Sequence, residues 1–214
     1  MKKIFVTTML LAGAVGAQAD GYVGATVGRG KLAFDCAQDA TCKKSINVFK
    51  LYAGTRLKEA SQFDLGIAKV DALEVAFQRS GSKGAENKTV EQSYLIIDPD
   101  NGNTVSTRMV LQRRLVSYDA LVLAPVVRMG LTREIDLFVK PGAAIVSTTV
   151  RTIVNDVGQQ SETQTKLKPY VSLGASLLVA GNFRVIGAFD WMPVSVGNVT
   201  GSTHSFNLGA EASF

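Results

Sequence analysis

The stretch that decides the fold is "HSFNLGAEASF", residues 204–214, at the end of the sequence. Every second residue from Phe206 to Phe214 is apolar, and the residues between them are polar or small. A period of two places these two sets on opposite faces of a β-strand. The sequence therefore predicts a final strand with one apolar face, one polar face and an aromatic last residue.

Other parts of the chain show the same kind of pattern, whereas helical periodicity is nearly absent. In one stretch, 116–130, both faces are apolar in the middle, so the pattern does not assign its two faces. The further predicted strands are 22–28, 48–57, 72–78, 116–130, 135–150, 169–179 and 183–192. Together with the last stretch they predict an all-β chain of eight antiparallel strands.

Long and short connections largely alternate between these strands. The stretches "LTRE" (131–134) and "AGN" (180–182) are short turns, whereas the long polar connections are 28–47, 80–106 and 151–166. This alternation predicts an up-and-down order with long loops at one end and short turns at the other. The stretch 58–71 breaks the order and would fit a small helix or an inserted hairpin.

The long connection at 80–106 also contains most of a predicted hairpin. Residues 94–110 flank the turn sequence "PDNGN", and an Asn-Gly pair between two strand-like stretches favours a tight hairpin turn. We expect two strands here to continue beyond the main sheet as a ribbon.

The first residues form a separate segment. Two lysines are followed by a short apolar core and by "AQA" at 17–19, the arrangement of a secretory signal peptide. The alternative, a membrane anchor, needs a longer apolar run. We therefore predict a signal peptide at 1–19 and a single barrel domain at 20–214, exported and without a lipid-anchoring cysteine at the cleavage site.

Composition excludes several classes of protein. The chain is 46% hydrophobic and 19% charged, with a formal net charge of +5. Its basic residues are scattered, so we expect no nucleic-acid partner. The two cysteines, Cys36 and Cys42, lie in a polar stretch, and export favours a disulfide between them. The alternative of a metal pair lacks a nearby histidine or third cysteine.

The polar faces of the predicted strands carry charges of both signs, which decides which face lies inside. In a small closed barrel these side chains could pair across the axis, and buried charges are costly unless they are paired. The apolar faces suit lipid, where a sheet has to close because every backbone group needs a partner. The predicted interior ion network consists of Lys50, Arg56, Glu74, Lys140, Arg184, Asp190 and Glu211.

Aromatic residues stand near several predicted strand ends. In transmembrane barrels such residues form girdles at the two membrane–water interfaces. We predict interface positions for Tyr22, Trp191 and Phe214. The sequence thus predicts an eight-stranded antiparallel up-and-down transmembrane β-barrel.

Four stretches carry a family resemblance: "LYAGTRL", "IDLFVKPGAAIVSTT", "SLGASLLVAGNFRVIGAFDW" and "FNLGAEASF". In this order they resemble the OmpA-like transmembrane β-barrel family of Gram-negative outer membranes. The resemblance implies long extracellular loops, short periplasmic turns and a terminal strand that the outer-membrane insertion machinery reads. Two departures stand out: no peptidoglycan-binding domain is expected after Phe214, and Ile186 and Ala188 occupy inward positions where relatives usually carry charges.

The resemblance also implies a function. We expect a monomer in the cell outer membrane, in contact with its lipid and lipopolysaccharide, that serves envelope integrity and surface contact through its loops. The alternatives are a narrow porin-like channel or a small-molecule uptake barrel.

A lipid-modifying enzyme is the third hypothesis. Enzymes of small barrels need a histidine with a nucleophile or carboxylate partner. The sole histidine, His204, lies two residues before Phe206 and is therefore predicted on the same outward face of the last strand. The sequence "HSFN" also lacks the His-x-Ser spacing of the lipid A deacylases. We expect no catalytic site, no metal site and no cofactor.

Overall fold

The computed structural model describes residues 20–34, 41–57, 63–64, 68–80, 84–98, 102–154, 158–196 and 199–214. The predicted signal peptide and Cys36 lie outside these ranges, so cleavage and the disulfide remain predictions. Within the described ranges no helix is long and apolar enough to cross a membrane. The strands are β1 (Gly21–Phe34), β2 (Thr41–Lys43), β3 (Ser45–Arg56), β4 (Phe63–Asp64), β5 (Lys69–Ser80), β6 (Gly84–Asp98), β7 (Gly102–Gly130), β8 (Ile135–Val154), β9 (Gly158–Ala180), β10 (Phe183–Val196) and β11 (Val199–Ser213).

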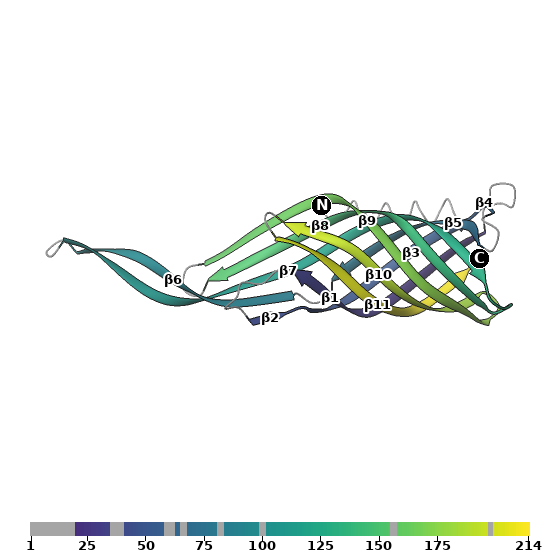
Figure 1. Cartoon of the computed structure of the whole chain (residues 1–214), viewed down its shortest axis with the longest axis horizontal. Helices are drawn as coiled ribbons and strands as arrows, with labels where there is room; N and C mark the ends of the chain where they lie inside the picture. Colours follow the sequence, from purple (N-terminus) through teal and green to yellow (C-terminus); the bar gives the residue numbers. More distant parts are fainter. Residues whose placement is uncertain are drawn as a thin grey trace.

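Eight of these strands close into a ring, in the order β1, β3, β5, β7, β8, β9, β10 and β11. Each strand pairs antiparallel with its neighbours, and β11 pairs with β1 to complete the circle. Figure 1 shows the tilted strands wrapping around a common axis. The predicted all-β, eight-stranded, up-and-down barrel is confirmed.

The closing seam joins the two ends of the described chain. Strand β1 pairs with β11 from Tyr22 opposite Ser213 to Phe34 opposite Gly201. The Gly21 amide donates to the Phe214 carbonyl at 3.1 Å, and the Phe214 amide donates to the Gly21 carbonyl at 2.9 Å. The aromatic terminal strand therefore closes the barrel.

Tight turns connect the strands at the end where Phe214 lies. The predicted turn at 131–134 links β7 to β8, and a two-residue turn with Gly181 at φ 51° links β9 to β10. A left-handed φ favours glycine, so Gly181 suits this position. In the stretch 58–71, β4 pairs with Lys69 and Val70 of β5, and residues 58–62 and 65–67 lie outside the described ranges.

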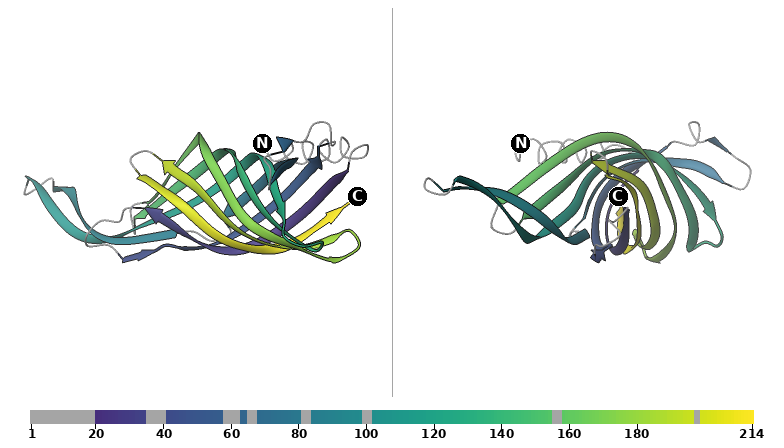
Figure 2. Two further views of the ribbon diagram at one scale, coloured as in Figure 1. Left: turned by 45° about the vertical axis from the view of Figure 1, so that its right-hand side comes forward. Right: turned by 60° about the vertical axis from the view of Figure 1, so that its left-hand side comes forward.

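Strands extend far beyond the ring at the opposite end. Strand β6 and residues 102–116 of β7 pair along their whole length, from Gly84 opposite Val116 to Asp98 opposite Gly102. We call this pair the protruding hairpin, which projects from the barrel in Figures 1 and 2. It confirms the predicted ribbon.

Two predicted loops are wrong in their extent. The stretch 28–47 was expected to be a long polar connection, but β1 continues to Phe34 and β3 begins at Ser45. The stretch 151–166 was expected to be a long polar connection, but β8 continues to Val154 and β9 begins at Gly158. Thr149 pairs with Thr163 in this region, and their hydroxyls lie 3.0 Å apart. Here β9 carries polar side chains on both faces from Gln159 to Lys166, which leaves no two-residue pattern in the sequence of this strand.

The apolar faces of the ring strands point outward. Val27 is 63% exposed and Phe206 is 56% exposed, whereas their neighbours Thr26 and Asn207 are buried. In the stretch 116–130, which the sequence left unassigned, Leu121 and Leu123 face outward. The even-numbered members of that stretch up to Val126 are buried inside. This arrangement is the reverse of a water-soluble barrel.

The interior has two zones. Near the short turns it holds charged residues and tyrosines, described below. Farther along the axis, toward the protruding hairpin, it holds buried apolar side chains together with uncharged polar ones such as Ser80, Thr148 and Thr203. The buried apolar residues of this second zone are Leu32, Ile46, Val48, Val116, Val146, Val150, Met192 and Val194.

Candidate functional site

The first group of interior charges is centred on Lys50. Its ammonium donates to the Tyr170 hydroxyl at 2.6 Å and lies 3.3 Å from the Asp190 carboxylate. Tyr170 in turn donates to Asp190 at 2.9 Å, and the Asn207 amide donates to the same carboxylate at 3.0 Å. Strands β3, β9, β10 and β11 thus meet at one buried carboxylate.

The second group joins Glu74 to Lys140. Their charged atoms lie 2.5 Å apart, and Glu74 also accepts a hydrogen bond from the Tyr22 hydroxyl at 3.2 Å. The Lys140 ammonium lies 4.8 Å from the centre of the Tyr52 ring and 4.7 Å from that of Phe138. Such contacts stabilise a desolvated cation.

The third group, at the short-turn end, contains partners that the sequence analysis missed. Arg128 lies between Asp71, at 3.2 Å, and Glu211, at 3.7 Å. Arg128 belongs to the stretch 116–130, whose two faces the sequence pattern did not assign, so nothing in the sequence indicated that its side chain points inward. It gives Glu211, which is 1% exposed, a compensating charge.

Two residues of the predicted interior ion network remain, Arg184 and Arg56, and they have different kinds of partner. Arg184 pairs with Asp136 and donates to the Ser176 hydroxyl at 3.1 Å. Asp136 lies four residues before Lys140 on the same strand and so on the same inward face, which means that the alternation in the sequence could have identified it. Arg56 donates to the hydroxyl of Ser213 at 3.1 Å rather than to a carboxylate.

Two tyrosines pack reciprocally against glycines of the neighbouring strand. Tyr52 lies over Gly24, its register partner, and a Cβ atom at Gly24 would collide with the tyrosine ring. Tyr22 lies over Gly54 in the same way. The bare glycine backbone gives each ring a flat surface, a known means of pinning strand register.

The predicted interface position of Tyr22 is therefore wrong. Its side chain is 0% exposed and lies inside the barrel. The reason is parity: Tyr22 shares the inward face with Gly24 and Thr26. By contrast, Phe214 is exposed at the short-turn end, and Trp191 lies half-buried on the outward face of β10.

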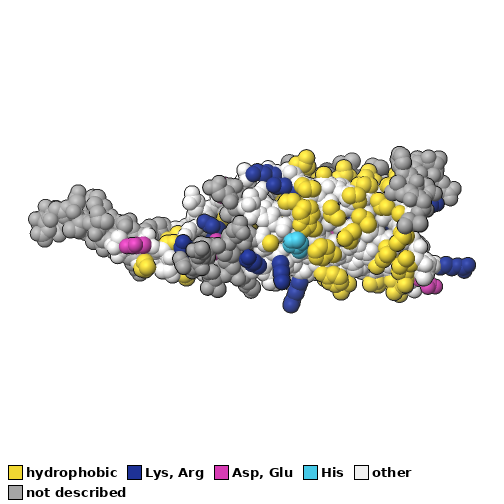
Figure 3. All heavy atoms as spheres, viewed as in Figure 1, with side chains coloured by type: hydrophobic (Ala, Val, Ile, Leu, Met, Phe, Trp, Pro, Cys, Tyr) yellow, Lys and Arg dark blue, Asp and Glu magenta, His cyan; other side chains and the backbone are white. Residues whose placement is uncertain are grey.

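A border runs around the outer wall where outward residues change from apolar to polar. On β1 the change falls between Val27 and Arg29, and on β8 it falls between Ile145 and Ser147. Figure 3 shows the apolar side chains over the barrel and Lys, Arg and His side chains beyond them. The first polar residues beyond the border are Arg29, Asn47, Arg79, Asp119, Ser147, Thr165 and His204.

The apolar belt below this border has the height of a membrane. On β8 it covers residues 135–145, which agrees with the roughly 9–11 residues of a tilted strand that crosses a bilayer. Above the border lie the protruding hairpin and the extensions of β8 and β9.

His204 has a hydroxyl partner that the sequence analysis did not anticipate. Its Nε2 atom lies 2.9 Å from the Ser202 hydroxyl, and its ring centre lies 6.1 Å from that of Phe189. Among the described residues no carboxylate contacts the imidazole, so the third member of a catalytic triad is not in place there. In the same part of the chain, no three His, Cys, Asp or Glu residues are grouped for a metal.

Comparisons with known proteins agree with this geometry. No protein-family model and no curated protein sequence matches the chain. Among solved structures, Neisserial surface protein A (NspA) superposes with a TM-score of 0.51 at 10% identity, over 91% of this chain and 97% of that one. The chain therefore shares the β-barrel fold of this surface protein.

Two further solved structures are similar to this one. Ail, the attachment invasion locus protein of Yersinia pestis, has a TM-score of 0.48 at 12% identity, covering 91% of this chain and 99% of that one. The N-terminal β-barrel domain of Pseudomonas aeruginosa OprF has a TM-score of 0.47 at 10% identity, covering 92% and 98%. At these identities the likeness concerns the fold alone.

Proposed function

We propose that the protein is an integral outer-membrane barrel that acts at the surface through its protruding strands. The observation that carries this proposal is the extension of β6 to β9 beyond the apolar belt, while β3 begins and β5 ends near the border. Paired strands that reach out of a membrane present a defined surface to partners. The barrel below them anchors this surface and contributes to envelope integrity.

The filled interior supports a structural role. Most of its charges form ion pairs, and the second zone holds buried apolar side chains such as Leu32 and Met192 beside buried serines and threonines. An eight-stranded barrel has an interior just wide enough for its own side chains. A channel would need both zones to rearrange.

A trimmed variant tests the surface role. The protruding hairpin would be cut above Glu86 and Arg114, which form an ion pair at 3.2 Å, and closed with an Asn-Gly turn. We expect the barrel to keep its heat-modifiable migration on gels, and cells that carry the variant to lose surface contact with host cells or extracellular matrix. Surface contact equal to that of the intact protein would contradict the proposal.

The same variant separates the two parts of the role. Envelope integrity would be measured as detergent sensitivity of a deletion strain. We expect the trimmed barrel to restore resistance as well as the intact chain does, because the membrane-embedded part is unchanged. A deletion strain with a normal envelope would contradict the integrity role.

We also propose that the protein is not an enzyme. His204 has a hydroxyl neighbour but lacks a described carboxylate partner. Replacing His204 by alanine should therefore leave the lipid A profile of the cells unchanged. A changed profile would favour a lipid-modifying enzyme.

A further inference from the structure

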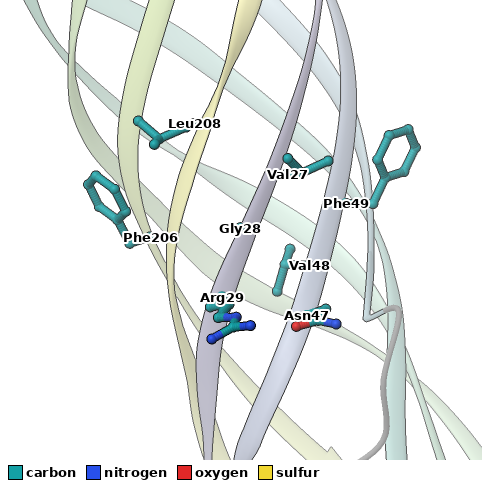
Figure 4. A pocket seen from close by; sticks show the side chains of 8 residues that line it. All are labelled: Val27, Gly28, Arg29, Asn47, Val48, Phe49, Phe206 and Leu208. Atoms are coloured by element: carbon teal, nitrogen blue, oxygen red, sulfur yellow. The ribbon is translucent and has the colours of Figure 1, made fainter.

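A depression of about 650 Å³ lies on the outer wall, across strands β11, β1 and β3. Its volume falls within the roughly 300–1,000 Å³ of ligand sites in proteins. Figure 4 shows Phe206, Leu208, Val27 and Phe49 along its length, with Arg29 beside Asn47 at one end.

The depression crosses the border between apolar and polar wall. Val27 and Phe206 are exposed below the border, and Arg29 is the register partner of both Phe206 and Asn47. An apolar surface that runs into a cationic end matches an amphiphile, whose acyl chains lie in the membrane and whose head group lies at the border.

A second cation lies next to the first. Lys31 is the next outward residue of β1 after Arg29, and it pairs in register with His204. Both cations are exposed, and no carboxylate of the described residues forms an ion pair with either of them. The border therefore carries local positive charge on this side of the barrel.

We propose that this depression binds a phosphate-bearing lipid of the outer leaflet. Its acyl chains lie over Val27, Phe49 and Phe206, and its phosphate is held by Arg29 and Lys31. A phosphate suits this place because the guanidinium fork can donate two parallel hydrogen bonds to it.

The binding experiment uses the full processed chain in an uncharged detergent. The probe is diphosphoryl lipid A, with dephosphorylated lipid A and inorganic phosphate as separate arms, and bound lipid is counted by native mass spectrometry. We expect lipid A to bind more tightly than its dephosphorylated form. Equal binding of the two lipids would overturn the proposal, and competition by inorganic phosphate at similar concentration would assign the site to free phosphate instead.

Variants locate the site. A cation near an anionic membrane surface contributes about fivefold in affinity, so Arg29→Ala with Lys31→Ala should weaken lipid A binding about thirtyfold. The control is Arg133→Ala, which removes an exposed cation from the turn at the opposite end, and it should change nothing. Unchanged binding by the double variant, or an equal loss in the control, would overturn the assignment.

A second pair of variants tests the apolar part. Phe206→Ala should weaken binding of both lipid forms, whereas Phe183→Ala, an exposed phenylalanine near the short-turn end of β10, should not. All five substituted side chains are exposed, and gel migration before and after heating shows that each variant is folded. An unaffected Phe206→Ala variant would mean that the acyl chains lie elsewhere.

Discussion

The ammonium of Lys140 lies 2.5 Å from the carboxylate of Glu74, and both side chains are buried although 66 residues separate them in the chain. The pair joins β5 to β8 across the strand between them. Breaking it would leave one charge buried without its partner.

We therefore predict that Glu74→Ala destabilises the barrel by about 3–5 kcal/mol, the usual effect of removing one partner of a buried ion pair. Tyr22 would lose its acceptor in the same variant. The measurement is urea unfolding in lipid vesicles, followed by gel migration.

The control for this prediction is Arg79→Ala. Arg79 and Asp119 form a bidentate pair, at 2.7 and 3.1 Å, but both are exposed. Exposed pairs contribute about 0–1 kcal/mol, so this variant should unfold almost like the intact protein. Equal losses in the two variants would contradict the structural role of the interior network.

A second prediction concerns the ring of Tyr22 above Gly54. A Cβ atom at residue 54 would collide with this ring, so Gly54→Ala should cost about 1–3 kcal/mol of stability, as overpacking does. Gly187→Ala is the matched control, since its Cβ would meet Leu208 at an ordinary 3.5 Å. If both variants unfolded at the same urea concentration, this packing would not matter.

A third prediction concerns the seam. Removing Phe214 deletes two backbone hydrogen bonds to Gly21 and an exposed interface side chain. We expect a much smaller heat-modifiable fraction in isolated membranes, whereas Phe214→Tyr should assemble normally because an aromatic ring remains at the interface. Normal assembly of the deleted form would contradict the role of this residue.

A fourth prediction separates a closed barrel from a narrow channel. Because paired charges and apolar side chains fill the interior, the purified protein should be silent in planar bilayers. Lys50→Ala removes one member of the first group of interior charges but leaves the second zone of the interior filled, so we expect no steady current from it either. Regular single-channel steps from the intact protein would favour the channel hypothesis.

Most of the fold could be predicted because membrane and interior impose opposite environments on alternate residues. In β3, for example, Phe49 faces outward and Lys50 inward, and the alternation of apolar and charged residues in the sequence predicts both orientations. Where the inside is apolar too, the contrast vanishes. Val122 and Leu123 differ in environment but not in polarity, so Arg128 on the same strand was not identified.

The strands beyond the membrane border were harder to predict for a related reason. Around Thr149 and Thr163 water replaces lipid, and polar residues suit both faces of the sheet. Tyr22 was placed wrongly for a different reason. Its aromatic ring and its position near a strand end predicted a membrane interface, whereas the alternation of residues along β1 predicted the inward face. Tyr22 follows the alternation and points inward, because Gly54 leaves room for its ring inside the barrel.

The account depends most directly on lipid lying against the outward face. The chain has a single tryptophan, Trp191, which lies on that face next to His204 across the β10–β11 pair. Its fluorescence should be measured in vesicles of lipids brominated along the acyl chain. Strong quenching by lipids brominated near the head group, with blue-shifted emission, is the result we predict. Emission typical of water, with no quenching by any brominated lipid, would contradict a membrane-spanning barrel.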